Sequence, residues 1–134
     1  MAARIVIVDD NEANLELVGY LLEAGGHTVL RAEDGEQALA LVHQLPRPDL
    51  VISDLRMPVM DGFELLSRIR QDATLDGLPV IAVTAFSMAA DRTRVMDAGF
   101  DGYLSKPIVP ESFIGEVEKF LQAGRRHAGS SSGP

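Results

Sequence analysis

The sequence IVIVDD at residues 5–10 places four consecutive β-branched residues directly before a pair of aspartates. β-branched residues favour strands, and a strand without polar alternation is typical of one buried on both faces. Asp9 and Asp10 stand immediately after this strand. The stretch predicts a central strand of a parallel sheet that delivers two carboxylates to the edge where such sheets bind ligands.

Four more strand-length runs follow, so that the predicted strands are residues 5–8, 28–30, 50–53, 80–84 and 102–104. Strands that alternate with helices join through right-handed crossovers. The chain is therefore predicted to be an α/β protein with a doubly wound parallel sheet. The apolar faces of the intervening helices are clearest at Leu15, Val18, Leu21 and Leu22, and at Phe113, Val117, Phe120 and Leu121.

Length and composition indicate a single domain. The 134 residues are 46% hydrophobic, which is enough to fill one core. From residue 123 the sequence AGRRHAGSSSGP has no periodicity and little to bury. We therefore expect a folded domain at residues 1–122 and a disordered tail at residues 123–134, either a linker remnant or an appended sequence.

Charge and cysteine content exclude several classes of protein. Twelve basic against 20 acidic residues give a formal net charge of −8, which leaves no broad basic surface for a nucleic-acid backbone. The absence of cysteine excludes disulfides and thiolate metal sites. No segment offers the roughly 20 apolar residues of a spanning helix, and the N-terminus has no signal-peptide pattern. We predict a soluble cytoplasmic protein without a nucleic-acid or membrane partner.

Polar side chains stand at the carboxyl ends of four of the predicted strands: Asp9 and Asp10, Asp54, Thr84 and Lys106. Singly, Asp9 or Asp10 is explained as the cap of the first helix, and the others as a loop start, a strand residue and a surface charge. Together they meet at one edge, where carboxylates repel one another unless a cation lies between them. Oxygen-only ligands are typical of Mg²⁺, and Mn²⁺ should substitute for it.

Asp54 is the candidate nucleophile at this edge. An ionised carboxylate forms an aspartyl phosphate without a general base. The Thr84 hydroxyl and Lys106, one of two lysines in the chain, would contact the phosphoryl oxygens. The pattern favours a site that accepts a phosphoryl group.

Five motifs stand in order at the predicted strand ends. They are IVIVDDN at 5–11, DLRMPVMDG at 54–62, VTA at 83–85, GFDGY at 99–103 and LSKP at 104–107. Over residues 4–122 the chain resembles the receiver domain of two-component response regulators. The resemblance implies a flavodoxin-like (CheY-like) three-layer sandwich with five helices and the sheet order 2-1-3-4-5. It also implies a histidine kinase or histidine phosphotransfer protein as phosphodonor.

The resemblance assigns a role to each residue of the site. Asp54 would be the phosphoacceptor in this phosphorelay. Thr84 and Lys106 would bind the phosphoryl oxygens, and the Lys106–Pro107 bond would be cis. The ligands of Mg²⁺ would be Asp9, Asp10, Asp54 and the backbone carbonyl oxygen of Arg56.

The resemblance also implies how the signal leaves the site. A phosphate draws the Thr84 hydroxyl inward, Tyr103 moves to a buried rotamer, and the surface of the fourth helix, fifth strand and fifth helix changes. The structural alternative for Tyr103 is a half-buried aromatic of an edge strand. Dimerisation through this surface on phosphorylation stays open. Such a domain catalyses only its own phosphorylation and dephosphorylation, so we expect no enzyme for a separate substrate.

Two other functions fit part of the pattern. A receiver-like interaction module binds a partner without phosphorylation, but it would lack Asp54, Lys106 or the acidic pair. A metal-dependent phosphatase would use Asp54 as a transient nucleophile and Asp10 as acid or base, yet the short connections leave no room for a cap. The cognate kinase, and whether the chain is a stand-alone regulator or part of a larger protein, stay open.

Phe86 stands two residues after Thr84, at a position that, with that of Arg56, affects phosphoryl loss in the family. Its bulky ring would hinder the attacking water, so we predict slow self-dephosphorylation. The Phe86→Ala variant should shorten the half-life of the aspartyl phosphate, followed as loss of the phosphoryl group with time. An unchanged or longer half-life would contradict this prediction.

Overall fold

The computed structural model of the protein describes residues 2–85 and 89–124. Its centre is a five-stranded sheet in the order β2-β1-β3-β4-β5, and each neighbouring pair of strands is parallel. The predicted fold class and strand order are thus confirmed. The strands are β1 Arg4–Val8, β2 Thr28–Ala32, β3 Leu50–Asp54, β4 Val80–Thr84 and β5 Gly102–Ser105.

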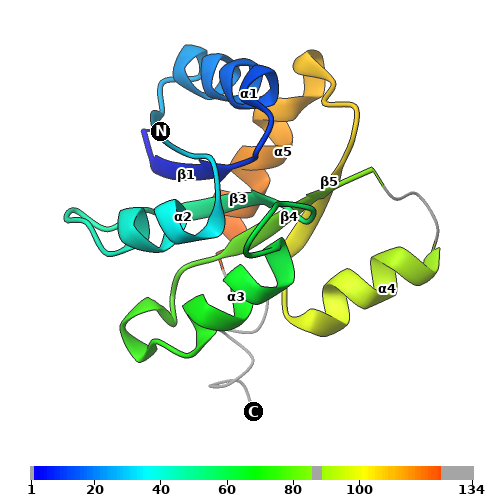
Figure 1. Ribbon diagram of the computed structural model, residues 1–134. Coiled ribbons are helices and arrows are strands. Elements are labelled where there is room, and N and C mark those ends of the chain that lie inside the picture. The colour runs from blue at the N-terminus through cyan, green and yellow to red at the C-terminus, as the bar shows by residue number, and fades with distance from the viewer. Residues whose placement is uncertain (1, 86–88, 125–134) are drawn as a thin grey trace.

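Helices cover both faces of the sheet. Figure 1 shows α1 and α5 on one face and α2, α3 and α4 on the other. This arrangement confirms the three-layer sandwich. The helices are α1 Glu12–Ala24, α2 Gly35–Val42, α3 Gly62–Arg70, α4 Ala89–Ala98 and α5 Pro110–Ala123, with a short 3₁₀ helix at Ala73–Leu75.

The core lies in two layers, one on each side of the sheet. In β1, Val6 and Val8 pack into the layer under α2, α3 and α4, whereas Ile5 and Ile7 pack into the layer under α1 and α5. All four side chains are buried. The uninterrupted run of β-branched residues is explained by this burial on both faces, as the sequence predicted.

Three strands, β2, β3 and β5, extend slightly past their predicted ends. β2 continues to Ala32 because Arg31 and Ala32 pair with Ile7 and Val8 of β1. Asp54 is the last residue of β3 rather than the first residue of a loop. The pairing of β2 with β1 depends on residues distant in sequence, which the short aliphatic run at residues 28–30 did not reveal.

Side-chain caps fix the starts of three helices. Asn11 Oδ1 accepts the backbone N–H of Asn14, at 3.0 Å, at the start of α1. Asp34 and Asp61 cap α2 and α3 in the same way. The explanation of Asp9 or Asp10 as the cap of the first helix is therefore wrong, because Asn11 fills that position. The Asp9 carboxylate instead accepts the N–H of Asn11 at 2.9 Å.

Several sequence features lie at the limits of the described residues. α5 ends at Ala123, one residue past the predicted domain boundary. Residues 125–134 of the predicted tail, and Phe86, lie outside the described residues. The Lys106–Pro107 bond is cis, as the resemblance implied, and Leu45–Pro46 is also cis. Within the described ranges, no helix has the length and apolar character needed to cross a membrane.

A buried ion pair lies at the edge of the sheet where β4 and β5 begin, opposite the edge formed by the strands' carboxyl ends. The Arg70 guanidinium at the end of α3 donates to Asp101 Oδ2 at 3.1 Å, and the Val80 N–H donates to the same oxygen at 2.9 Å. The Asp101 side chain is fully buried, so the pair also satisfies a carboxylate that burial would otherwise destabilise. The contacts join α3 to the segments that begin β4 and β5.

A second charged pair links α2 to the segment after α3. His43 Nε2 lies 2.6 Å from Asp72 Oδ2, and His43 Nδ1 lies 2.8 Å from the Leu39 carbonyl oxygen. The hydrogen bond to Asp72 raises the pKa of His43 above its ordinary value. The hydrogen bonds from His43 and Thr74 lower the pKa of Asp72 to about 2. The pair of protonated His43 and ionised Asp72 is therefore favoured in the fold.

We predict that this pair stabilises the fold most between the ordinary pKa values of Asp and His, about 3.9 and about 6.5. Because the pKa of His43 is raised, its contribution is lost as pH rises through the folded value. Because the pKa of Asp72 is lowered, the contribution of this carboxylate to stability is lost as pH falls toward its folded value of about 2. The loss of unfolding free energy in His43→Gln should be larger at about pH 5.5 than at about pH 8.5.

Urea unfolding of both proteins at the two pH values measures this difference. Other titrating groups are common to both proteins and cancel in the comparison. The effect should be small, since both side chains are partly exposed and the pair is screened. A difference that stays constant or grows toward alkaline pH would contradict the prediction.

Candidate functional site

The carboxyl ends of four strands bring the predicted polar residues to one edge of the sheet. Asp9 follows β1, and Asp54 and Thr84 are the last residues of β3 and β4. Lys106 follows β5, and its N–H donates to the Thr84 carbonyl oxygen at 2.8 Å. Since β1, β3, β4 and β5 are neighbours in the sheet, residues far apart in sequence meet here (Figure 1).

Three carboxylates form the acidic part of the site. One oxygen each from Asp9, Asp10 and Asp54 lies within 4.8 Å of the others. Asp54 is buried, Asp9 is half-buried and Asp10 is exposed. Burial raises the pKa of Asp9 and the charge of Asp54 raises it further, while the N–H of Asn11 opposes the rise. The cluster gains stability from any cation that enters it.

The donor set of this cluster suits a hard divalent cation. Its ligand atoms are carboxylate oxygens, and the exposed side of Asp10 leaves room for water to complete the coordination. Mg²⁺ and Mn²⁺ take such oxygen ligands, whereas softer metals favour nitrogen or sulfur. The residues present therefore fit the metal that the sequence predicted.

The Asp54 carboxylate is held in a fixed orientation. Its Oδ1 accepts the N–H of Leu55 at 2.8 Å, and its Oδ2 lies 3.3 Å from Lys106 Nζ. The side chain of Asp54 is 10% exposed and that of Lys106 is 28% exposed, so the ion pair is only partly screened by solvent. A small opening to solvent and a neighbouring ammonium are what an acceptor of an anionic group requires.

The predicted phosphoryl-binding residues line one small hollow. It has a volume of about 210 Å³ and is lined by Asp54, Leu55, Arg56, Thr84, Ala85 and Lys106. The structure therefore brings Asp54, Thr84 and Lys106 together around one space, although their roles stay predictions. Arg56 is exposed and stands two residues after Asp54.

A larger apolar hollow adjoins this site and was not predicted from the sequence. It has a volume of about 460 Å³ and lies between α1 and the segment after β5, with Leu15, Val18 and Ile108 among its walls. Asp9, Asp54 and Lys106 also line it. Sequence periodicity places Leu15 and Val18 on a buried face of α1, but it does not show that packing there is incomplete.

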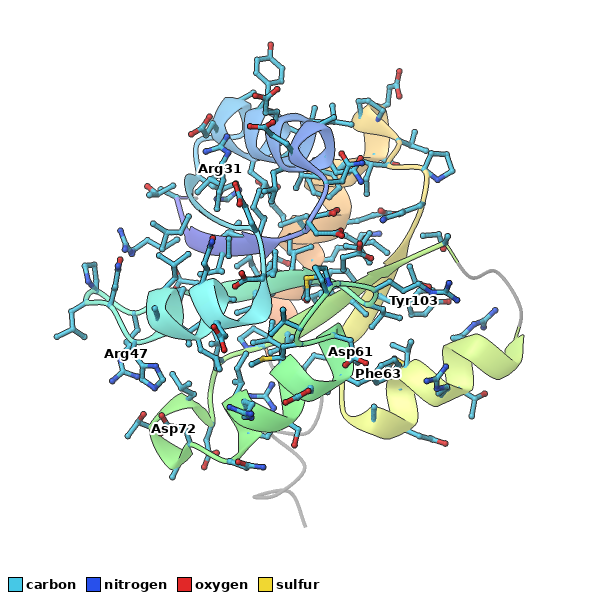
Figure 2. The ribbon with its side chains drawn as sticks, in the orientation of Figure 1. Arg31, Arg47, Asp61, Phe63, Asp72 and Tyr103 are labelled. Atoms are coloured by element: carbon cyan, nitrogen blue, oxygen red, sulfur yellow. The ribbon has the colours of Figure 1, made fainter. Side chains whose placement is uncertain are left out.

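Tyr103, the predicted switch residue, lies on β5 opposite Ala82 in the strand register. Its side chain is half-buried and packs on the sheet face covered by α4 (Figure 2). The Tyr103 ring does not line the hollow that contains Thr84. The structure thus places the two predicted switch residues on adjacent strands, Thr84 in β4 and Tyr103 in β5.

Gly62 positions the loop that follows Asp54, a role that sequence reasoning missed. Its N–H donates to the Leu55 carbonyl oxygen at 2.9 Å. A Cβ atom at residue 62 would lie 2.5 Å from the Asp54 carbonyl oxygen and 2.9 Å from the Leu55 Cα. In the sequence, Gly62 stands only as the last residue of the motif at 54–62. The need for glycine arises from a close approach across the loop.

Comparison with known proteins gives consistent matches. The sequence profile of the response regulator receiver domain matches residues 5–118. The polar-differentiation response regulator DivK of Brucella anthropi is 39% identical over 121 residues, which cover 90% of this chain and 98% of that protein. The chain thus spans nearly the full length of this relative.

Solved structures share the fold. The chemotaxis response regulator CheY4 of Vibrio cholerae aligns with a TM-score of 0.81 at 31% identity, over 89% of this chain and 98% of that one. The receiver domain of a sensor histidine kinase from Pseudomonas aeruginosa aligns with a TM-score of 0.76 at 32% identity, over 91% and 96% of the two chains. In the latter structure a magnesium ion is coordinated in the active site cleft.

We predict that Gly62→Ala destabilises the domain by about 1–3 kcal/mol, because the new methyl group must displace backbone rather than a mobile side chain. The matched control is Gly115→Ala in α5, where a Cβ atom meets nothing within 4 Å. That change should stabilise the helix by up to about 1 kcal/mol. Urea unfolding of the three proteins measures both effects, and equal stability of Gly62→Ala and wild type would refute the steric argument.

Proposed function

The chain belongs to the family of response regulator receiver domains, and we propose that in this member Asp54 accepts the phosphoryl group. The observation that carries the proposal is the shared hollow that Asp54, Thr84 and Lys106 line. Outside this hollow, one oxygen each from Asp9 and Asp10 lies within 4.8 Å of an Asp54 oxygen. A phosphohistidine of a histidine kinase or histidine phosphotransfer protein is the proposed donor. The family signals in two-component systems, which supports a donor of this class.

The transfer needs no general base. A lone pair of an Asp54 carboxylate oxygen forms the new P–O bond as the P–N bond of the phosphohistidine breaks, and the departing electron pair stays on the imidazole nitrogen. The N–H of Leu55 and the ammonium of Lys106 hold the carboxylate in place for this attack. Orientation and charge compensation therefore account for most of the acceleration.

Two side chains are proposed to receive the new phosphate. Lys106, already 3.3 Å from Asp54 Oδ2, would pair with a phosphoryl oxygen. The Thr84 hydroxyl would donate to another, since Thr84 lines the same hollow. Bound by Asp9, Asp10, Asp54 and the carbonyl oxygen of Arg56, Mg²⁺ or Mn²⁺ would supply positive charge that offsets the phosphoryl oxygens.

The proposed output is a shift between two arrangements of the domain. Movement of the Thr84 hydroxyl toward the phosphate would open space for Tyr103 and change the surface of α4, β5 and α5. A second copy of the chain docking on that surface, a cytoplasmic location and the lack of nucleic-acid contact stay predictions. We also propose that the domain acts on its own aspartate alone, with no separate substrate.

The test is intact mass after incubation with acetyl phosphate and Mg²⁺. Wild type should gain the mass of one phosphoryl group, and Asp54→Ala should gain none because the nucleophile is absent. The matched control is Asp97→Asn, which removes an exposed aspartate of α4 and should be phosphorylated like wild type. Chelation of the metal should abolish the adduct, and Mn²⁺ should restore it.

Absence of the adduct from folded wild type would contradict the proposal. The chain would then be better described as a receiver-like interaction module that binds its partner without phosphorylation. An adduct that persists in Asp54→Ala would place the phosphoryl group on another residue. Loss of the adduct in Asp97→Asn would show that loss of an exposed carboxylate outside the site also abolishes phosphorylation, so the result for Asp54→Ala would not identify the acceptor.

A further inference from the structure

The anchoring of α4 differs from that of the other helices on its face. Among the side chains described in α4, residues 92–98, only Val95 is buried, and Met96 is partly buried. α3 is fixed more firmly by four buried residues, Gly62, Leu65, Leu66 and Ile69. Over residues 92–98 α4 therefore buries little apolar surface, and interactions of its exposed side chains contribute to its position.

Two of those interactions join arginines of α4 to aromatic rings on other elements. The Arg94 guanidinium carbon lies 4.7 Å from the centroid of the Phe63 ring of α3. The Arg92 guanidinium carbon lies 5.9 Å from the centroid of the Tyr103 ring of β5. Phe63 and Tyr103 both lie on the α4 side of the sheet (Figure 2). Each arginine therefore fastens α4 to a different neighbour.

The interaction of Arg92 with Tyr103 is sensitive to the position of the ring. Cation–π attraction extends to about 6 Å from the ring centroid, so this pair stands near the outer limit. A Tyr103 ring that turned inward toward Thr84 would leave this range. Within the described part of the chain, no carboxylate forms an ion pair with Arg92. Because the attraction acts only while the ring stays within this range of Arg92, it favours the half-buried position of Tyr103.

We propose that Arg92 is a positioning residue that holds the Tyr103 ring in its half-buried position and thereby opposes the switch. The inference rests on the proposed function, because it concerns the response to phosphate at Asp54. An interaction that stabilises only the unphosphorylated arrangement must weaken phosphoryl binding, and linkage makes the two effects equal in size. Removal of Arg92 therefore shifts the population toward the switched arrangement before any phosphate is bound.

The aromatic composition of the chain provides a specific probe. It contains two tyrosines and no tryptophan. Incorporation of 3-fluorotyrosine therefore gives two ¹⁹F resonances, one from Tyr103 and one from Tyr20. Tyr20 is 68% exposed on α1, on the opposite face of the sheet from α4, and serves as the internal reference. Beryllofluoride with Mg²⁺ is the stable analogue of the phosphoryl group.

Arg92→Ala should bind beryllofluoride about two- to fivefold more tightly than wild type, the factor expected for removal of one exposed cation–π interaction. Its unliganded Tyr103 resonance should move toward the position seen in the beryllofluoride complex, while the Tyr20 resonance stays fixed. Arg92→Lys keeps a cation over the ring and should restore wild-type behaviour at least in part. Arg68→Ala, which removes another exposed arginine, controls for the change in net charge.

A long-range effect of charge predicts the opposite change in beryllofluoride affinity. Loss of a positive charge weakens binding of an anion, so an Arg92 that acted only through long-range charge would make Arg92→Ala bind beryllofluoride less tightly. The double-mutant cycle with Tyr103→Leu separates the two cases. If Arg92 acts through the ring, Arg92→Ala has no tightening effect in the Tyr103→Leu background.

Unchanged or weaker beryllofluoride binding by Arg92→Ala, with normal binding by wild type, would overturn this inference and leave the proposed function intact. Equal tightening in both Tyr103 backgrounds would also overturn it. Failure of wild type to bind beryllofluoride would count against the proposed function and, with it, against this role of Arg92.

Discussion

Burial of the sheet on both faces confines polar side chains to the ends of its strands. Val6 and Val8 on one face and Ile5 and Ile7 on the other leave no position within this part of β1 for a charged group. Because the strands are parallel, their carboxyl ends meet at one edge. The carboxylates, the hydroxyl and the ammonium of the site are neighbours for this reason, although they come from four separate segments.

The site that results is electrostatically unbalanced. Three carboxylate oxygens lie within 4.8 Å of one another, and Lys106 supplies the ammonium paired with Asp54. The raised pKa of Asp9 reflects burial and this repulsion. Such a cluster favours both a divalent cation and, once the cation is present, an anionic group that completes the charge balance. The rigid strands hold the carboxylates in a position that an isolated loop could not maintain.

The helices of the domain differ in how much of their described surface is buried. α1 and α5 cover a continuous apolar layer that includes Leu22, Phe113 and Val117, all almost completely buried. Among the described side chains of α4, residues 92–98, only Val95 is buried, and two arginines lie over aromatic rings of neighbouring elements. Firmly packed helices preserve the site, while a helix held by fewer buried contacts can change position in response to it. The fold therefore supplies both stability and a surface able to transmit a signal.

The sequence by itself determined the elements and the set of chemical groups. The periodicity of apolar residues indicates where strands and helices lie, since it depends on near neighbours in the chain. Motif order indicated Asp54, Thr84 and Lys106 and the family that carries them. Only the tertiary structure decided that Asn11 rather than Asp9 or Asp10 caps α1, and which distant groups come together. Three further features depend on how separate segments pack: the need for glycine at residue 62, the His43–Asp72 pair and the placement of Arg92 over Tyr103. The local sequence pattern does not show which distant segments come into contact.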